Sequence, residues 1–389
     1  MSKELIFLLL ASLFTIHSCS SNNTEQDVFV FDPSKDYPEF PLALNDVADI
    51  RYVKFGGEED GVFISTLWDW GLYIDDCHNR IFADNFLIGV MEFDTDGNFL
   101  RKLGRLGNGP GEYGTTFFYV QPDKERVGVY DLGREKFLIY NYDGSFLKDE
   151  GIEASLFIST SSSFQIQDNC LVSFNPYSTV FHESSGRTNS TSKKTLDLFP
   201  LDGQSGVRIK DIHYEKPIVS PRSWGVYNQM TSGYLSPSYS GLLMTTYRCD
   251  TTYVIEKDFT WRPFLVNNRH NGVNEGCLYP VAETKDYLFL CHKNNLLGGQ
   301  VFFFALDKNT KEAYKITEDK SNPLPGYLQG KIQIRNEGIT KNSDYRFWEL
   351  HPEELKGEYY EYLPSELKTL VDLCDDGSNP IYMLIKFKK

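Results

Sequence analysis

The chain has 389 residues, which is long enough for two ordinary domains or for one large all-β domain. Phe and Tyr occur 28 and 24 times and are accompanied by 30 glycines, a composition that favours strands joined by tight turns over helical bundles. The formal net charge of −15, which no run of Lys or Arg relieves, argues against binding to a nucleic-acid backbone.

The beginning of the chain has the features of an export signal. Lys3 precedes an apolar stretch over residues 5–16, which is too short to span a bilayer comfortably. The sequence IHSC that ends at Cys19 resembles the cleavage site of bacterial lipoprotein signals. This resemblance implies a signal peptide over residues 1–18 and a lipidated Cys19, and residues 19–40 are expected to carry the lipid and form a tether. The alternative is a plain secretory peptide with a coincidental Cys.

The remaining cysteines do not form a recognisable framework. Their spacing is wide and irregular, no C-x-x-C occurs, and a core of this size does not need disulfides. We therefore expect mostly buried free thiols among the six further cysteines, Cys77, Cys170, Cys249, Cys277, Cys291 and Cys374.

Two segments that begin at Ile81 and Val127 align without gaps and define a repeat of 47 residues, the separation of Gly97 from Gly144. Each unit has an apolar strand, a polar turn, a second strand, an Asp-Gly turn and a third strand. The Asp-Gly pairs predict two-residue hairpins of type I′, because their central positions require a positive φ. The stretch DTDGN resembles the start of a calcium loop but lacks the later ligands, so the hairpin is the favoured interpretation.

Units of several strands that repeat every 40 to 50 residues are typical of propeller blades. Weaker echoes occur at residues 201–203, 241–266 and 287–306. The sequence therefore predicts an all-β fold with a single propeller domain over residues 41–389. Dividing residues 40–389 by the size of one blade gives six to seven blades.

Four stretches carry a more specific resemblance. They are FDTDGNFL, YNYDGSFL together with the nearby Asp131, GRLGNGPGEY, and the closing SNPIYMLIKFKK. Together they resemble the six-bladed β-propeller lipoproteins of Gram-negative gut anaerobes, which are relatives of NHL-repeat propellers. The resemblance implies a six-bladed propeller held at the outer membrane by its lipid, on either the periplasmic or the surface-facing side. It does not imply an activity.

The end of the chain predicts how the ring closes. A propeller leaves open sheet edges unless its first and last strands share a blade. Residues 381–387 alternate as a half-buried strand does, and we expect them to pair with a strand within residues 50–55. A short helix is expected before this strand, with Ser365 as its N-cap and with Leu367, Leu370 and Val371 on its apolar face.

The glycine-rich stretch over residues 104–113 follows a strand, as a dinucleotide-binding loop does, but it leads into a segment that reads as extended. Without a helix N-terminus there is no aligned set of N–H groups for a pyrophosphate, and Pro110 removes a further donor. The stretch therefore predicts a crossover between blades. Arg105, Glu112 and Tyr113 are candidates to line the mouth of a ligand pocket.

Two Cys-His pairs, Cys77-His78 and Cys291-His292, both follow an apolar strand. Thiolate and imidazole are common zinc ligands, but equivalent positions on separate blades are expected to lie far apart on the ring. We therefore expect no metal ligands and no cofactor. Adjacent carboxylates such as Asp75-Asp76 point to opposite faces of a strand, so they do not by themselves form a catalytic pair.

The tryptophans are the other candidates for ligand binding. Trp68 and Trp70 share one face if their segment is a strand, and Trp224 lies in a polar stretch. Exposed aromatic side chains on a propeller face would stack on sugars, peptides or flat ligands, whereas packing into the core is the favoured alternative.

The sequence contains no recognisable catalytic constellation, and no catalytic residue is assigned. The favoured hypothesis is a membrane-anchored lipoprotein whose propeller face binds a glycan, a small molecule or a protein, without catalysis. The alternative is a lyase or hydrolase whose residues are spread over several blades around the central channel. A sensory or assembly role through protein contacts is a third possibility.

Overall fold

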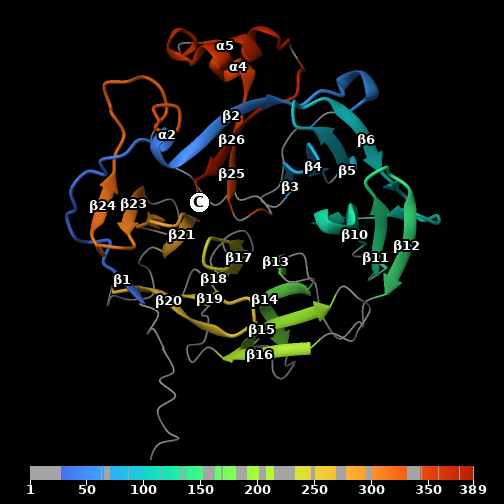
Figure 1. The fold of residues 1–389 in the computed structure, drawn as a ribbon, viewed down its shortest axis with the longest axis horizontal. Helices are drawn as coiled ribbons and strands as arrows, with labels where there is room; N and C mark the ends of the chain where they lie inside the picture. Colours follow the sequence, from blue (N-terminus) through green and yellow to red (C-terminus); the bar gives the residue numbers. More distant parts are fainter. Residues whose placement is uncertain are drawn as a thin grey trace, which may run out of the picture.

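The structure is a computed structural model. It describes residues 28–62, 64, 71–85, 87–114, 116–131, 133–134, 136–151, 163–167, 170–180, 191–200, 207–213, 233–246, 250–268, 277–294, 300–330, 342, 344–357, 359–375 and 377–388. Within these residues the fold is almost entirely antiparallel sheet, and the sheets stand around a common centre (Figure 1). The all-β fold predicted from the composition, and the propeller predicted from the repeat, are thus confirmed.

Five of the sheets in the described part of the chain have four or five strands, and we call them blades I to V. In Figure 1 strands β3, β13, β17 and β21 lie nearest the centre. The bounds are as follows: blade I, β3 (Leu72–Asp75), β4 (Arg80–Asn85), β5 (Gly89–Asp94) and β6 (Phe99–Leu103); blade II, β9 (Thr116–Gln121), β10 (Arg126–Asp131), β11 (Lys136–Asn141) and β12 (Phe146–Gly151); blade III, β13 (Ser163–Gln167), β14 (Cys170–Val180), β15 (Thr191–Pro200) and β16 (Val207–His213); blade IV, β17 (Gly233–Pro237), β18 (Leu242–Thr246), β19 (Thr251–Ile255) and β20 (Trp261–Asn267); blade V, β21 (Cys277–Glu283), β22 (Tyr287–Lys293), β23 (Val301–Asp307) and β24 (Ala313–Ile316).

A sheet of three described strands joins the two ends of the chain, and we call it the closing sheet. It contains β2 (Ala48–Lys54), β26 (Ile381–Phe387) and β25 (Tyr345–Leu350), in that order. β26 pairs antiparallel with β2, with Ile385 opposite Ile50, so the predicted closure is confirmed.

The expectation of six full blades is corrected to five blades and this smaller closing sheet. Dividing the chain length by one blade failed because several segments do not form blade strands. Residues 32–43 run between sheets, and residues 351–380 contain the short helices.

The segment before the closing sheet is part of the folded domain. β1 (Phe29–Phe31) adds to blade IV as a parallel neighbour of β20. Further along, the Phe40 amide donates to the carbonyl of Lys315, and the Lys315 amide donates to the carbonyl of Pro38, at the edge of blade V. Residues 29–31 and 38–40 therefore contact two blades through their backbones.

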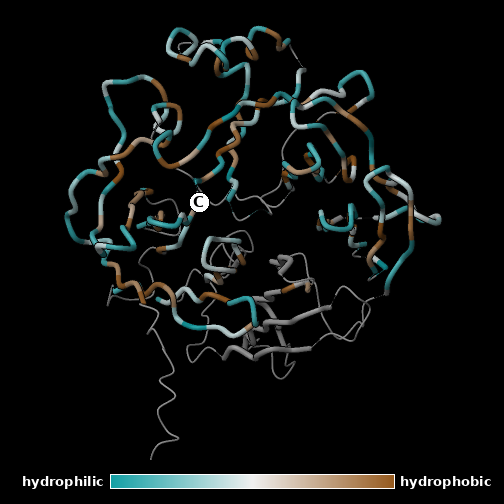
Figure 2. The backbone as a smooth tube through the Cα atoms, viewed as in Figure 1, coloured by the Kyte–Doolittle hydropathy of each residue, from teal (hydrophilic) through white to brown (hydrophobic). Residues whose placement is uncertain are grey.

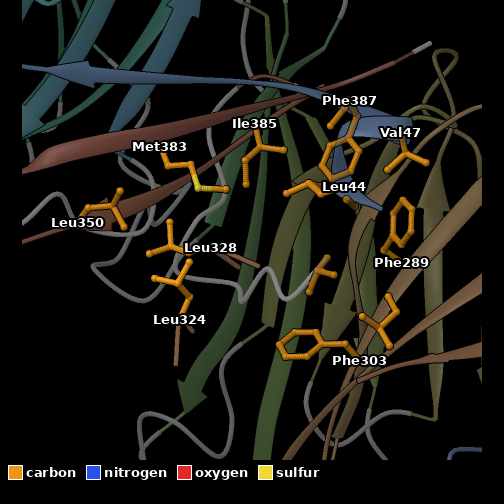
Figure 3. Close-up of a cluster of buried hydrophobic side chains, with 14 of the residues drawn as sticks. Leu44, Val47, Phe289, Phe303, Leu324, Leu328, Leu350, Met383, Ile385 and Phe387 are labelled. Atoms are coloured by element: carbon orange, nitrogen blue, oxygen red, sulfur yellow. The ribbon is translucent and has the colours of Figure 1, made fainter. Parts of the chain in front are cut away.

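The hydrophobic core is divided into wedges between neighbouring sheets. Hydrophobic stretches, brown in Figure 2, occur in sheets on several sides of the ring. One cluster joins the closing sheet to blade V, another joins it to blade I, and a third joins blades I and II. Figure 3 shows the first of these, in which side chains of β26, β22, β23 and α2 (Leu44–Val47) meet. Each blade is thus held mainly by its neighbours, since both faces of a blade must be covered.

The two Asp-Gly hairpins form as expected, but their turn type differs from the prediction. In the first, the Gly97 amide donates to the carbonyl of Asp94, and the Asp94 amide donates to the carbonyl of Asn98. This is a type I turn followed by a glycine at φ 91°, not a two-residue type I′ turn. A Cβ at Gly97 would lie 2.3 Å from the Lys54 carbonyl oxygen in the closing sheet. The glycine therefore allows close approach as well as positive φ.

The predicted C-terminal helix is α5 (Ser365–Asp372), which buries Leu367 and Val371. Its N-cap is Pro364, so the expectation that Ser365 occupies this position is corrected: Ser365 is the first helical residue. α5 lies with α4 (Pro352–Leu355) outside β2, at the rim of the ring (Figure 1).

Candidate functional site

The glycine-rich stretch is the crossover from blade I to blade II, and its own side chains close it. Its two short strands, β7 (Arg105–Leu106) and β8 (Glu112–Tyr113), pair in parallel. The Glu112 carboxylate accepts a hydrogen bond of 2.7 Å from the Gly109 amide and forms an ion pair with Arg105. The hydrogen bond from Gly109, together with the ion pair, lowers the pKa of Glu112. The loop's acidic side chain thus takes the place that a ligand phosphate would need.

The three candidate residues of this loop differ sharply in exposure. Tyr113 is completely buried, where its hydroxyl donates to the Leu103 carbonyl at 2.6 Å and accepts from the Val90 amide at 3.0 Å. Arg105 is 79% exposed. Tyr113 therefore serves the packing of blade I, while a role for Arg105 or Glu112 at a pocket mouth stays a prediction. Cys19, Trp68, Trp70 and Trp224 lie outside the described residues.

The two Cys-His pairs belong to blades I and V, on either side of the closing sheet. Cys291 is buried in β22, and its thiol donates to the Tyr279 hydroxyl at 3.1 Å. His292 is also buried and stacks on Phe302. Cys77, in contrast, is an exposed free thiol. In the described ranges no group of three or more His, Cys, Asp and Glu side chains gathers as a metal site.

A dense polar network surrounds the connection from β3 to β4, residues 75–79, which we call the aspartate turn. The Asp75 side chain is only 3% exposed. One carboxylate oxygen accepts the amides of Cys77 and His78, at 3.1 and 3.3 Å. The other accepts His78 Nδ1 at 2.8 Å and the Tyr142 hydroxyl of blade II at 2.7 Å. Four donors thus satisfy a carboxylate that burial would otherwise destabilise.

This network fixes the orientation of His78. A carboxylate can only accept, so Nδ1 carries a proton, and in the neutral imidazole Nε2 is then the acceptor. The His78 side chain is 35% exposed, and Nε2 lies 3.9 Å from Oε1 of Glu125, which follows β9 of blade II. The edge of the ring packs on Tyr142, with centroids 5.6 Å apart. Burial, followed by the hydrogen bond to Asp75, raises the pKa of Tyr142, so its hydroxyl stays a donor.

The next residue of the turn joins blade I to the closing sheet. The Asp76 carboxylate accepts the Tyr345 hydroxyl at 2.8 Å and pairs with Lys386 and, at 4.0 Å, with Arg51. Partial burial by itself raises the pKa of Asp76, but the hydrogen bonds from Lys386 and Tyr345 outweigh it and lower the pKa. Burial and the hydrogen bond to Asp76 raise the pKa of Tyr345 to about 12. The aspartate turn therefore contacts the sheets on both sides of blade I.

A second buried carboxylate occupies the equivalent connection of blade V, residues 283–287, which we call the glutamate turn. Glu283 has a side chain that is fully buried. It accepts the amide and the hydroxyl of Ser240 in blade IV, at 3.0 and 2.5 Å, and Lys308 Nζ at 2.6 Å. Lys308 also lies over the ring of Tyr239, 4.8 Å from its centroid. Here the charge of the carboxylate is matched within the protein.

An arginine links three sheets close to the centre of the ring. Arg346 of β25 is 1% exposed. It donates from Nε to the carbonyl of Val281 in β21 at 2.6 Å, and from Nη2 to the carbonyl of Pro237 in β17 at 3.3 Å. These bonds tie the closing sheet to blades IV and V, which makes Arg346 a structural residue of the ring.

Sequence reasoning placed Cys77-His78 at a turn but missed the partners that give His78 its geometry. The local signal for the turn was the polar run DDCHN after an apolar strand. Glu125 and Tyr142 belong to the next blade, and nothing in their own neighbourhood marks them as partners of Asp75.

The antiparallel sheets form a ring, and strands from both ends of the chain close it. This arrangement defines a β-propeller. The sequence model of the family described as "Domain of unknown function (DUF4934)" matches residues 35–386, and the chain belongs to this family. No curated protein matches the chain significantly.

Two solved structures from Bacteroides are similar to it. A Bacteroides fragilis NCTC 9343 protein described as exported has a TM-score of 0.61 and 16% identity, over 93% of this chain and 100% of that one. At this identity the similarity shows the fold alone. A member of the duf4221 family from Bacteroides vulgatus has a TM-score of 0.47 and 12% identity, over 88% of this chain and 98% of that one. In the part of the chain that the structure describes, no helix is long and apolar enough to cross a membrane.

Proposed function

We propose that the protein is an exported lipoprotein whose propeller binds a ligand on the ring face that carries the aspartate turn. The observation that carries this proposal is the His78 imidazole, which the buried Asp75 holds with its Nε2 directed away from the network and beside Glu125. Polar groups that a rigid scaffold holds in advance bind ligands without a further ordering cost. The aspartate turn is such a scaffold, because hydrogen bonds join it to both neighbouring sheets.

The side chains of His78 and Glu125 limit which class of ligand this site can bind. Nε2 of His78 and the carboxylate of Glu125 both accept hydrogen bonds. The matching ligand offers donors, either the hydroxyl groups of a glycan or the ammonium or amide groups of a peptide or small molecule. Because this site lies where blades I and II meet, both blades contribute to it, as is common for ligand sites.

Binding is tested by thermal shift on the full-length chain, with a library of glycans, peptides and amines. A ligand that binds only the folded state raises the melting temperature by mass action. We expect the shift to disappear in His78→Ala and to persist in His351→Ala, which removes another half-exposed histidine on a different sheet. A ligand whose shift survives His78→Ala, and which the wild-type protein leaves chemically intact, would show that binding takes place elsewhere on the propeller.

Lipid attachment at Cys19 and residence in the outer membrane complete the proposal. The signal-like sequence before Cys19 supports them. The relation to NHL-repeat propellers stays a prediction. Labelling of cells with a fatty acid, followed by membrane fractionation, tests both points. A chain that is labelled equally in the wild type and in Cys19→Ala would refute attachment at this residue.

A lyase or hydrolase activity is the second candidate, and the Asp75–His78 pair is the observation that favours it. A buried carboxylate that orients an imidazole is the arrangement by which many enzymes present a general base. Every ligand that gives a thermal shift is therefore incubated with the protein, and its products are analysed. Turnover that His78→Ala abolishes while binding persists would establish this candidate, and intact ligand would favour binding alone.

A further inference from the structure

We propose that His78 and Glu125 form a two-residue site for a divalent transition metal, of which Zn²⁺ is the best match. Nε2 of His78 and Oε1 of Glu125 lie 3.9 Å apart, on two different blades. Imidazole nitrogen and carboxylate oxygen are both ordinary ligands of Zn²⁺, and water completes the coordination sphere. This site differs from the pairing of Cys77-His78 with Cys291-His292, because it needs neither thiol.

The distance between the two atoms suits an ion between them. With bonds of about 2.1 Å, a tetrahedral ion requires its two ligand atoms to lie about 3.4 Å apart. The observed 3.9 Å between Nε2 of His78 and Oε1 of Glu125 is too long for a hydrogen bond. It is only slightly longer than the separation that a bound metal ion requires. The Glu125 side chain is 66% exposed and is free of the packing that would prevent it from moving this far.

The second observation that points to a metal is the carboxylate behind the histidine. Metal-binding histidines almost always donate their other nitrogen to a carboxylate, a carbonyl or a water, which fixes the tautomer and raises the basicity of the ligand nitrogen. Asp75 fulfils this role, because its buried carboxylate accepts Nδ1 at 2.8 Å. The Tyr142 hydroxyl, which donates to the same carboxylate oxygen, holds Asp75 in place from blade II.

His351 shows what the site would look like without this support. Both of its nitrogens face carboxylates, with Nε2 3.5 Å from Glu349 and Nδ1 3.7 Å from Glu353. Neither distance fixes a tautomer, and the Glu353 side chain is 74% exposed. His351 has a similar exposure to His78, at 38%, and is therefore a matched control for non-specific metal binding.

Only two protein ligands are assigned, so the affinity is expected to be modest. The described residues contain no complete set of three metal ligands, and water must supply the rest. A hard cation such as Ca²⁺ prefers six or more oxygen ligands and gains nothing from the imidazole. The inference goes beyond the proposed function and holds whether or not an organic ligand binds the same face.

The test is calorimetric titration of the metal-free full-length chain with Zn²⁺ alone, and then with Ca²⁺. We expect one Zn²⁺ per chain at this site, loss of the corresponding heat in His78→Gln, and an unchanged titration in His351→Gln. Asp75→Asn is expected to weaken binding about 10- to 100-fold, since it removes the carboxylate behind the ligand.

Two results would overturn the inference: a Zn²⁺ titration that is identical in the wild type and His78→Gln, or a loss of binding in His351→Gln alone. Circular dichroism on each variant confirms that it is folded, and Glu125→Gln provides a second variant at an exposed position if Asp75→Asn does not fold. The titration contains no organic ligand. Its failure therefore leaves the thermal-shift test of the proposed function untouched, and the reverse also holds.

Discussion

The aspartate turn of blade I and the glutamate turn of blade V join equivalent strands, but their buried carboxylates have different partners. Glu283 is matched inside the protein by Lys308, whose side chain is only 14% exposed. Asp75 is matched by amides, a tyrosine hydroxyl and His78, whose other nitrogen remains available at the surface. Each turn holds two sheets together, and only the aspartate turn also offers a group to a ligand.

This difference teaches which part of such a turn is architectural. In both turns the buried carboxylate accepts hydrogen bonds from a neighbouring blade, from Tyr142 in one and from Ser240 in the other. Because a wedge of core holds each blade on its neighbours, a polar bond across the wedge fixes their relative position. The second partner of the carboxylate differs between the two turns. Lys308 neutralises Glu283 inside the protein, whereas His78 keeps one nitrogen at the surface, where we propose that it binds a ligand.

The largest effect is expected from Glu283→Gln in the glutamate turn. The amide keeps the shape of the side chain but leaves the Lys308 ammonium without its charge partner in a site where little water reaches it. Breaking such a buried pair costs about 3 kcal/mol of the free energy of unfolding. Urea denaturation measures it. Lys308→Met in the Glu283→Gln background should recover part of the loss, whereas a single variant as stable as the wild type would show that the turn does not hold the blades.

A smaller loss is expected from Tyr142→Phe in the aspartate turn. The change removes one hydrogen bond to a charged group and leaves the ring in the core, so about 1.5 kcal/mol of the free energy of unfolding should be lost. Tyr140→Phe is the matched control, because its hydroxyl donates only to the neutral carbonyl of Gly111, at 2.8 Å. Equal losses in the two variants would contradict a special role for the bond to Asp75.

The sequence alone was sufficient for the parts of the fold that depend on local pattern. The alternation over residues 381–387 predicted the closing strand, and the Asp-Gly pairs predicted both hairpins. It could not predict the turn type, because the close approach of Gly97 to Lys54 is a contact between sheets. The number of blades was wrong because segments such as residues 32–43 and 351–380 do not form blade strands, which the length of the chain does not reveal.

The candidate site was less predictable than the fold. Asp75 and Tyr142 are 67 residues apart, and each looks like an ordinary residue of a turn. Arg346 gives a stronger hint, since it interrupts an apolar strand, but its partners in β17 and β21 are 109 and 65 residues away. Only the packing of one blade on the next brings these groups together, and no local periodicity encodes that packing.

The third prediction concerns acid and the other carboxylate of the aspartate turn, Asp76. Its pKa in the folded protein lies below the ordinary value of 3.8, so the folded state binds this proton less tightly than the unfolded state does. The stabilisation is therefore present above that value and is lost as the pH falls through the folded pKa.

Asp76→Asn should lower the free energy of unfolding at neutral pH, by less than Tyr142→Phe because the side chain is 38% exposed. The free energies of unfolding of variant and wild type should therefore converge as the pH falls from 3.8 through the folded pKa of Asp76. A difference that stays constant with pH would mean that the charge of Asp76 does not contribute.

Among these substitutions, His78→Ala is expected to have the smallest effect on stability and the largest effect on binding. His78→Ala removes a hydrogen bond to Asp75 at a position that water can reach, so the free energy of unfolding should change by only about 0.5 kcal/mol. Lys308→Ala, the corresponding change in the glutamate turn, leaves Glu283 buried and unpaired and should cost several times more. If denaturation shows this asymmetry while Zn²⁺ and ligand binding are lost only in His78→Ala, the histidine is retained for binding. If the two variants are equally destabilised, His78 belongs to the architecture of the turn, as Lys308 does.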